Sequence, residues 1–266
     1  MLKKYRFNRI CKRIKNLDIQ GASNVAKAAL KAYYLFPSAD TKKILLKLRP
    51  TEPLLSHVLS LAGKKPKKEI LQHFSAAQYH INKLVFSLIK NNYTIFTHCH
   101  STNVVSALIY AKKHGKKFRV YNTETRPLFQ GRKTAKELGR AGIEVVNVVD
   151  SAAAIAINSS NIVFIGADAL LDTGVINKVG SGMFSEIAKN RGVPVLIIAD
   201  SWKYSHKSIR LEQRDFKEIW NPKINKVHIK NPAFEFVKKE NISKIVTERG
   251  IDSYSDFLKK VSKKEY

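Results

Sequence analysis

The sequence predicts an α/β protein in which a helical N-terminal domain is followed by a Rossmann-like domain built on a parallel sheet. Two observations lead to this prediction. Residues 1–91 follow the periodicity of amphipathic helices. After Asn92, short β-rich segments alternate with segments of helix length, an order that requires crossover connections and therefore a parallel sheet. We expect one domain over residues 1–91 and a second domain, which carries the ligand site, over residues 92–266.

The helical region is divided by residues that break helices. Apolar residues recur at helical spacing over 22–35 and again over 70–89. Pro50 and Pro53 interrupt another helical stretch, because proline lacks the backbone N–H that a helix interior needs. The charged segment 64–68 is predicted to be a connector. These boundaries predict a small helical bundle.

The second region contains the strands. Five segments rich in β-branched and aromatic residues are predicted to be strands: 94–97, 118–122, 145–149, 162–165 and 193–198. Helices are predicted in four segments between them: 103–114, 133–141, 152–158 and 182–190. The run 195–198 is apolar at every position, which is typical of a parallel strand buried on both faces. The remainder, 231–266, carries one more apolar stretch and a basic end.

The composition limits the class of protein. A chain of 266 residues with 44% apolar residues fits one large domain or two small ones. No run of eighteen apolar residues is present, so we expect no membrane span. The basic N-terminus lacks the apolar segment and cleavage site of a signal peptide, and the two cysteines, Cys11 and Cys99, are too few for a disulfide framework. These features predict a cytoplasmic protein in a reducing compartment.

The charge of the chain is strongly positive. Lys and Arg number 48 against 21 Asp and Glu, which gives a net charge of +27 at pH 7. The cations are spread in pairs along the chain, with neither a zinc-finger spacing nor the signature of an RNA-recognition motif. We therefore expect weak electrostatic attraction to RNA rather than specific recognition. The same field concentrates anionic substrates near the protein.

Two chemically reactive side chains follow predicted strands. Cys99 is placed at the C-terminal end of the first strand, and Asp168 at the C-terminal end of the fourth. Because the C-terminal ends of parallel strands meet at one edge of the sheet, we expect the thiol and the carboxylate to serve there as base and acid. A helix that starts just after Cys99 is expected to lower the thiol pKa, and burial is expected to raise the pKa of Asp168. The alternative for Cys99 is a small buried apolar residue.

Several segments around these two residues are suited to holding phosphate groups. Helix N-termini, glycine-rich turns and cations all attract phosphate oxygens. The residues that supply these features are Ser101, Thr102 and Asn103 at a helix start, Asn177 and Lys178 in the Gly-rich turn 174–182 before a second helix start, Lys203, and Arg49. Four separate anion-binding elements predict a substrate with two phosphates.

Two other polar groups lie close to this region in the sequence. Glu124 and Arg126 follow the second predicted strand, where they either form one wall of the pocket or make a structural ion pair. His98 and His100 flank Cys99, but adjacent residues on a strand point to opposite faces. We therefore predict no metal site there.

Short motifs in a fixed order relate the chain to a known family. They are Gln20-Gly-Ala, Arg49-Pro-Thr, Thr97-His-Cys, Thr123-Glu-Thr-Arg-Pro with Gln130-Gly, Val149-Asp-Ser-Ala-Ala, Gly166-Ala-Asp and Val175-Ile-Asn-Lys-Val-Gly. With them, the chain resembles the family that joins the alpha, beta and delta subunits of translation initiation factor 2B with isomerases of 5-methylthioribose 1-phosphate and ribose 1,5-bisphosphate. The resemblance covers nearly the whole chain. It implies a helical domain, a Rossmann-like domain, a cleft between them, and a homo-oligomer of the dimer or hexamer-of-dimers type.

Within this family the resemblance is to the isomerases, and most of all to the archaeal ribose 1,5-bisphosphate isomerases. The isomerases use a catalytic Cys and Asp, which the translation-factor subunits generally lack, and Cys99 and Asp168 stand at the matching positions. The resemblance also implies ligand contacts at Gln20, Gly21, Ala22, Ser23, Arg49, Asn177, Lys178 and Lys203. Three features depart from the isomerases: Gln20 replaces an Arg, His100 replaces an Asn, and the N-terminal domain is shorter.

The expected function is an aldose–ketose isomerase that converts ribose 1,5-bisphosphate to ribulose 1,5-bisphosphate in nucleotide salvage. Neutral Asp168 is expected to protonate the ring oxygen, and the Cys99 thiolate to take the proton from C2; a direct hydride shift is the alternative. Neither route needs a metal or an organic cofactor. A second function stays open, a non-catalytic regulatory subunit that binds a nucleotide or sugar phosphate and a protein or RNA partner. Gln20, His100 and the shorter N-terminal domain favour it.

Overall fold

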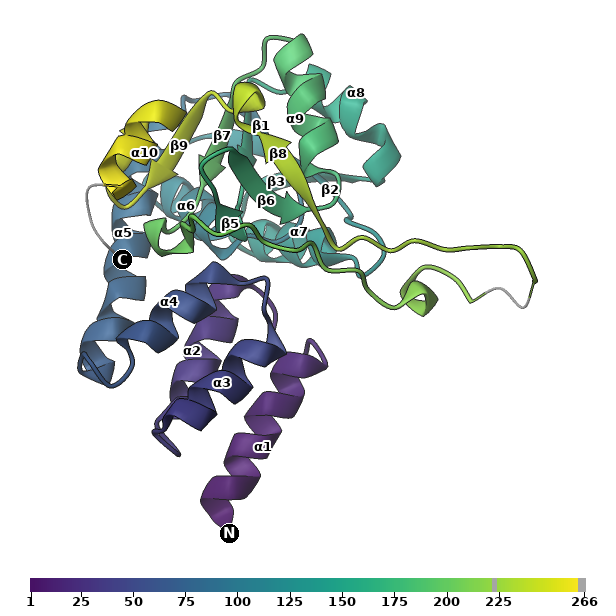
Figure 1. Cartoon of the computed structure of the whole chain (residues 1–266). Coiled ribbons are helices and arrows are strands. Elements are labelled where there is room, and N and C mark those ends of the chain that lie inside the picture. The colour runs from purple at the N-terminus through teal and green to yellow at the C-terminus, as the bar shows by residue number, and fades with distance from the viewer. Residues whose placement is uncertain (222–223, 263–266) are drawn as a thin grey trace.

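The computed structural model describes residues 1–221 and 224–262, and its N-terminal part consists of helices joined by short turns (Figure 1). These helices are α1 (Leu2–Lys15), α2 (Ala22–Tyr33), α3 (Ala39–Leu48), α4 (Pro53–Leu61) and α5 (Lys67–Leu88). Pro53 is the first residue of α4, a position where no backbone N–H is needed, and Pro50 lies in the turn after α3. The predicted helical character of this region is confirmed. None of the described helices is both long enough and apolar enough to cross a membrane.

A seven-stranded sheet forms the centre of the rest of the chain, with strand order β10-β9-β7-β4-β1-β2-β3. Its parallel strands are β1 (Tyr93–Thr97), β2 (Phe118–Thr123), β3 (Glu144–Val148), β4 (Ile162–Ile165), β7 (Val195–Ile198) and β9 (Lys244–Thr247). Strand β10 (Gly250–Asp252) pairs antiparallel with β9 at the edge. All five predicted strands are present and parallel, so the predicted α/β class with a Rossmann-like sheet is confirmed.

Helices cover both faces of this sheet. On one face lie the second half of α5 together with α6 (Thr102–Lys113) and α7 (Gln130–Arg140). On the other lie α8 (Ala153–Asn158), which follows a short turn η1 (Asp150–Ala152), α9 (Ser181–Asn190) and α10 (Tyr254–Ser262). Neighbouring strand residues divide between the two layers, since Ile95 packs in one core and Phe96 in the other. The four predicted helices of this region are confirmed to within a few residues at their ends.

A second, antiparallel sheet is an element that the sequence pattern did not predict. It consists of β5 (Ala169–Leu170), β6 (Gly174–Lys178) and β8 (Phe234–Lys238), with the short helix η4 (Lys239–Asn241) after β8. The expected Gly-rich turn over 174–182 is therefore wrong in its first half, which is a strand. Gly174 is required there because β8 passes close by, and a Cβ on Gly174 would lie 2.3 Å from the carbonyl oxygen of Val237.

Helix α5 connects the two parts of the molecule. Its first half, including Ile70 and Phe74, packs in the core of the helical bundle. Its second half, including Ile81 and Val85, packs in the core beneath the sheet. The domain boundary expected after residue 91 stays a prediction, and the packing adds that α5 belongs to both cores.

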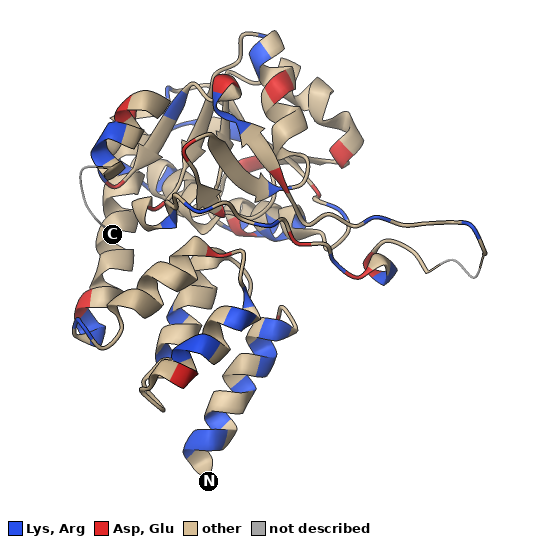
Figure 2. Ribbon diagram, viewed as in Figure 1, with Lys and Arg blue, Asp and Glu red and all other residues tan. Residues whose placement is uncertain are grey.

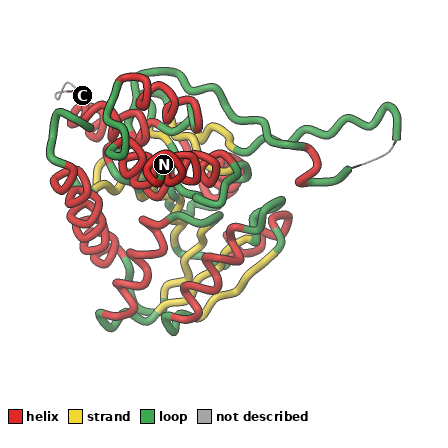
Figure 3. The backbone as a smooth tube through the Cα atoms, turned by 90° about the horizontal axis from the view of Figure 1, so that it is seen from below, coloured by secondary structure: helices red, strands yellow, loops and turns green. Residues whose placement is uncertain are grey.

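The chain between η2 (Ser201–Lys203) and β8 departs from the layered arrangement. It runs away from the body and returns, with the short helix η3 (Phe216–Glu218) on its course (Figures 1 and 3). Close to the body, this segment passes the edge where β1 and β4 end and brings two charged residues, Glu212 and Arg214, to that edge.

Candidate active site

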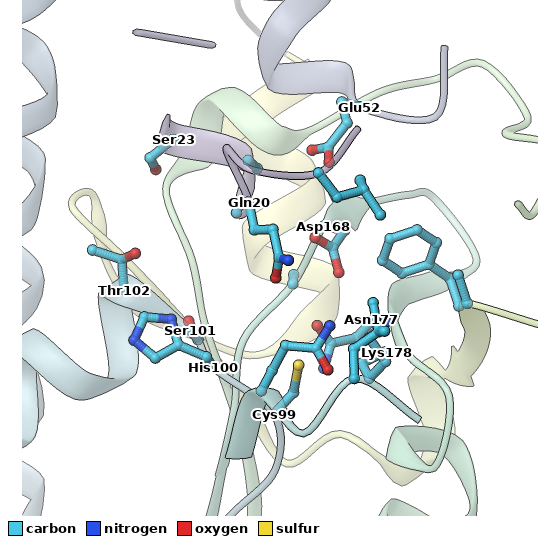
Figure 4. Close-up of a pocket in the computed structure, with 18 of the residues that line it drawn as sticks. Gln20, Ser23, Glu52, Cys99, His100, Ser101, Thr102, Asp168, Asn177 and Lys178 are labelled. Atoms are coloured by element: carbon cyan, nitrogen blue, oxygen red, sulfur yellow. The ribbon is translucent and has the colours of Figure 1, made fainter. Parts of the chain in front are cut away.

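A pocket lies where the helical bundle meets the C-terminal ends of the adjacent strands β1 and β4 (Figure 4). Thirteen of the fifteen site residues predicted from the sequence line it: Gln20, Gly21, Ala22, Ser23, Arg49, Cys99, Ser101, Thr102, Asn103, Asp168, Asn177, Lys178 and Lys203. The bundle contributes the first five of these residues, and the sheet and its loops contribute the rest. The side chains of Gln20, Cys99 and Asp168 point into the same space (Figure 4).

The backbone at Cys99 is held in an unusual conformation. Its φ of 62° lies in the left-handed region, which is unfavourable for a residue with a Cβ. Two hydrogen bonds hold it there: the Cys99 N–H donates to Thr125 Oγ1 at 3.1 Å, and the Cys99 carbonyl accepts from Thr134 Oγ1 at 2.7 Å. The chain can therefore turn sharply between β1 and α6, with the sulfur directed into the pocket (Figure 4).

The electrostatic environment of Cys99 differs from the expected one. Burial of the thiol raises its pKa to about 11, and the nearby charge of Lys178 offsets only part of this effect. The expected thiolate near neutral pH is therefore wrong for the empty pocket. The desolvation of a negative sulfur outweighs the favourable field at the start of α6.

This environment gives a first prediction, on the reactivity of the thiol. In a Cys11→Ser background, the rate at which iodoacetamide modifies Cys99 should rise about tenfold per pH unit up to roughly pH 11, because only the thiolate reacts. Adding Lys178→Met removes the cation that lowers the pKa and should slow the reaction at any fixed pH below 11. A rate that levels off below pH 9 would contradict the structure.

Asp168 follows β4 and is fixed by its backbone. Its N–H donates to the carbonyl of Ile176 at 2.9 Å, which ties it to strand β6. Burial raises the pKa of Asp168, while the cations Lys203 and Lys178 act in the opposite direction. The expected direction for this carboxyl is confirmed. A carboxyl that retains its proton more readily than usual is suited to act as a general acid.

Among the expected phosphate-binding elements, the start of α6 matches the prediction most fully. Ser101 caps the helix by accepting a hydrogen bond from the N–H of Val104 at 3.4 Å, and Thr102 is the first helical residue. Gly166 allows the end of β4 to pass here, since a Cβ on it would lie 2.5 Å from the side chain of Ser101. The Asn103 amide donates to Gln78 at 2.9 Å and so is held against α5.

The start of α9 does not serve as the second anion site that the sequence predicted. The N–H of Gly182 already donates to the carboxylate of Glu235 on β8. The Asn177 amide donates to Ser181 Oγ at 2.8 Å, which fixes Asn177 to this helix start. Lys178, the next residue on β6, lies over the ring of Phe234 with its ammonium 5.1 Å from the ring centre.

The remaining cations of the pocket are also engaged within the protein. The buried Lys203 ammonium donates to the Ala167 carbonyl at 2.6 Å. The Arg49 guanidinium lies 3.2 Å from Glu52 and 3.4 Å from Glu212. Burial, followed by the charge of Asp168, raises the pKa of Glu52 to about 7.

Glu124 and Arg126, in contrast, do not reach the pocket. Glu124 pairs with Arg132 at 2.8 Å, and the exposed Arg126 lies over the ring of Phe129, 5.0 Å from its centre. Both the expected pocket wall and the expected pairing of Glu124 with Arg126 are therefore wrong. The loop bends so that other residues, including Gln130, face the pocket instead.

Twelve lining residues were not predicted as site residues: Leu17, Glu52, His98, His100, Leu128, Gln130, Lys133, Ala167, Glu212, Arg214, Ala233 and Phe234. Some of them carried a sequence signal, because they adjoin a predicted residue or stand close to it in the chain, as Glu52 does three residues after Arg49 in the turn between α3 and α4. The residues of the long segment between η2 and β8 carried none. Their position depends on strand pairing between β6 and β8.

The histidines beside Cys99 are hydrogen-bonded within the protein. His98 is buried between Thr123 Oγ1 at 2.5 Å and the Val179 carbonyl at 2.9 Å, and burial lowers its pKa to about 4. His100 pairs with Glu137 at 3.2 Å. Within residues 1–221 and 224–262, three potential metal ligands gather at one place, where atoms of His73, Asp200 and Glu248 lie within 4.8 Å of one another. His73 bonds to Asp200, and Glu248 accepts from Ser201, so we assign no metal there.

Comparisons with known proteins connect this geometry to characterised relatives. The model of the initiation factor 2 subunit family matches residues 41–253. The ribose 1,5-bisphosphate isomerase of Archaeoglobus fulgidus is 32% identical, with 90% of this chain and 87% of the relative covered. That of Methanocaldococcus jannaschii is 33% identical, with 90% and 89% covered. A 5-deoxyribose 1-phosphate isomerase of Clostridium botulinum is 35% identical over 69% of this chain and 60% of the relative.

Two solved structures share the fold over almost the whole chain. The translation initiation factor eIF-2B of Pyrococcus horikoshii superimposes with a TM-score of 0.82 at 25% identity, covering 93% of this chain and 97% of that one. The 5-methylthioribose 1-phosphate isomerase of the same organism gives a TM-score of 0.80 at 22% identity, with 97% and 87% covered. The fold is therefore common to relatives with different names.

Proposed function

The chain belongs to the initiation factor 2 subunit family, and from this premise we propose that it is a sugar-phosphate isomerase that converts ribose 1,5-bisphosphate to ribulose 1,5-bisphosphate. The observation that carries the proposal is the placement of Cys99 and Asp168 on one pocket, at the ends of the paired strands β1 and β4. The names of the archaeal relatives, which align over about nine-tenths of this chain, support the same substrate.

The two side chains account for every proton that the reaction moves. Asp168 gives its proton to the ring oxygen as the bond from that oxygen to C1 breaks, and the Cys99 thiolate takes the proton from C2. The product of this step is an enol phosphate with a double bond between C1 and C2. The C2 hydroxyl then returns a proton to Asp168 while the thiol delivers its proton to C1, which leaves a ketone at C2. The cycle ends with both groups in their starting states.

The pKa values of Asp168 and Cys99 in the empty pocket affect this scheme in opposite ways. The raised pKa of Asp168 favours the neutral acid that opens the ring. The pKa of about 11 at Cys99 leaves little thiolate at neutral pH, so Lys178, the cation that lowers this pKa, assists the base. The C1 phosphate fits the start of α6 beside Lys178, where a helix N-terminus and a cation meet.

The experiment that tests the proposal is turnover of ribose 1,5-bisphosphate by the purified protein, followed by phosphorus NMR. Appearance of ribulose 1,5-bisphosphate supports the isomerase. Binding of the sugar phosphate without conversion would reject it and favour the second candidate, a regulatory subunit that senses a sugar phosphate or nucleotide. The presence of Gln20 and His100 on the pocket wall is the observation that favours this second candidate.

The basic surface of the bundle supports the weak attraction to RNA. Helix α1 carries seven Lys and Arg residues and no acidic residue, and all seven are exposed (Figure 2). None of the seven forms a salt bridge with a described residue. We expect binding to RNA of mixed sequence that weakens steeply as salt rises, measured by fluorescence anisotropy at 50 and 200 mM salt. Affinity that is insensitive to salt would contradict an electrostatic origin.

We also propose how the protein assembles and where it is located. The family resemblance supports a homo-oligomer of the dimer or hexamer-of-dimers type, which light scattering in solution distinguishes from a monomer. A cytoplasmic location is supported by the two cysteines, Cys11 and Cys99, which are both free.

A further inference from the structure

The end of the pocket around Arg49 differs from a simple phosphate site because acidic side chains surround the cation. Arg49 follows helix α3, and its guanidinium is neutralised twice, by Glu52 at 3.2 Å and by Glu212 at 3.4 Å. A phosphate cannot use this guanidinium fully while both carboxylates hold it. Glu212 also pairs with Arg214 at 3.2 Å, so these four side chains carry two positive and two negative charges when all are ionised. Arg214 can hold Glu212, which leaves Glu52 as the carboxylate that occupies Arg49.

Glu52 is the more deeply buried of the two carboxylates. It is 4% exposed, and its Oε2 atom is buried with no hydrogen-bond partner among the residues that the structure describes, as is Nε of Arg49. An ionised carboxylate with one unsatisfied oxygen is costly to bury. The ion pair of Glu52 and Arg49 therefore has unused hydrogen-bonding atoms in the empty pocket. A proton on Glu52 or a polar group of a ligand can supply the missing interactions.

Charged groups from four parts of the chain act on Glu52. Arg49 at the end of α3 and Lys203 in η2 favour its ionised form. Asp168 after β4 and Glu212 in the long segment oppose it. Burial adds to the opposing side, with the result that the pKa of Glu52 lies at about 7, where a small change in charge alters its protonation state.

Building on the proposed isomerase function, we propose that Glu52 is a specificity-determining residue: it is the internal counter-ion of Arg49, and a second phosphate binds at Arg49 only when Glu52 takes up a proton and releases the guanidinium. The proposed function places the C1 phosphate at the start of α6, so the other end of the sugar, which carries C5, faces Arg49 on the bundle side of the same pocket. The phosphate on C5 is therefore the one affected.

The physical consequence is a selectivity that depends on pH. With Glu52 ionised, this end of the pocket prefers a sugar whose C5 group is uncharged, because a phosphate would meet a buried carboxylate. With Glu52 protonated, Arg49 becomes available and the bisphosphate is accepted. A bound phosphate places another negative charge beside Glu52, which raises the pKa of Glu52 and retains the proton.

The test measures binding separately from turnover by using Cys99→Ala as the background. Isothermal titration of ribose 1,5-bisphosphate and of ribose 1-phosphate is carried out between pH 6 and pH 8, with and without Glu52→Gln. At pH 8 we expect Glu52→Gln to bind the bisphosphate about tenfold more tightly than the background does, and the monophosphate within about twofold of it. Between pH 8 and pH 6 the background should gain about tenfold more affinity for the bisphosphate than Glu52→Gln gains.

The number of protons taken up when the bisphosphate binds tests the protonation of Glu52 directly. Titrations in buffers of different ionisation enthalpy should show about one more proton taken up per bisphosphate with Glu52 present than with Glu52→Gln. The difference between the variants cancels the proton exchange of the phosphates themselves. Glu52→Asp, which keeps the carboxylate, should keep the pH dependence, and so should Glu212→Gln, which removes the other partner of Arg49.

The outcomes separate this inference from the proposed function. Equal pH dependence with Glu52 and with Glu52→Gln, in variants whose circular dichroism and melting curves show folded protein, overturns the role of Glu52 and leaves the isomerase proposal standing. Failure of every folded variant to bind either sugar phosphate rejects the proposed substrate class and, with it, this inference.

Discussion

Replacing Cys99 with alanine is expected to lower kcat for isomerisation of ribose 1,5-bisphosphate by at least about 10³-fold, equivalent to about 4 kcal/mol of transition-state stabilisation. The reason is chemical. The thiol is the base that removes the proton from C2 and the acid that returns a proton to C1. The two histidines beside it are held within the protein, His98 in hydrogen bonds to Thr123 and Val179 and His100 in a pair with Glu137. Phosphorus NMR of the product measures the loss.

The matched control for this variant is Cys11→Ala, which removes the other free cysteine, located on α1 away from the pocket. It should turn over substrate at the rate of the unaltered protein. Addition of the sugar phosphate should still raise the melting temperature of Cys99→Ala, because the cations that bind the ligand remain in this variant. If Cys99→Ala retains a tenth or more of the original kcat, Cys99 is not the base and the hydride-shift route gains support.

The fold was predictable from the sequence wherever the pattern is local. Strands β1, β2, β3, β4 and β7 are short segments rich in β-branched and aromatic residues, and both this composition and the alternation with helices indicated them. Strands β6 and β8 were missed for the opposite reason. They pair with each other although a helix, a strand and the long segment lie between them in the chain, and no local pattern records that pairing.

The candidate site was predictable because strand ends are visible in a sequence. Cys99 and Asp168 meet on one pocket since parallel strands end at one edge, a rule that needs no knowledge of side-chain contacts. The sequence could not predict which ion-pair and hydrogen-bond partners each charged group has. Arg49 looked like a free cation, and only the three-dimensional structure shows that Glu52 and Glu212 hold it. Likewise, the helix start at Gly182 looked open but is capped from β8.

The pKa of Cys99 shows the same difference between local and three-dimensional information. The sequence indicated a helix start after the thiol, which is correct, and from it a lowered pKa, which is not. The field of one helix end acts over a single turn, whereas burial depends on every element around the sulfur. In this pocket burial has the larger effect.

Asp168→Asn is the second variant for which we expect a large effect, a fall in kcat of about 10²- to 10⁴-fold. The amide has nearly the shape of the carboxyl, so the backbone link of this residue to Ile176 should be preserved. It cannot give an acidic proton to the ring oxygen, and ring opening is the step that should fail. Phosphorus NMR measures this loss as it does for Cys99→Ala, and Glu124→Gln, a carboxylate outside the pocket that pairs with Arg132, serves as the control of unchanged rate.

The same variant has a second consequence that a merely structural role of Asp168 would not produce. The charge of ionised Asp168 contributes to the raised pKa of Cys99, so its removal should lower that pKa and speed iodoacetamide modification of Cys99 at alkaline pH below about 11, where Asp168 is ionised in the unaltered protein. Slow turnover together with faster alkylation is the expected pair of results, because the acid is lost while the base is made more available. Slow turnover with unchanged alkylation would mean that the carboxylate does not act on the thiol, and unchanged turnover would remove Asp168 from the proposed chemistry.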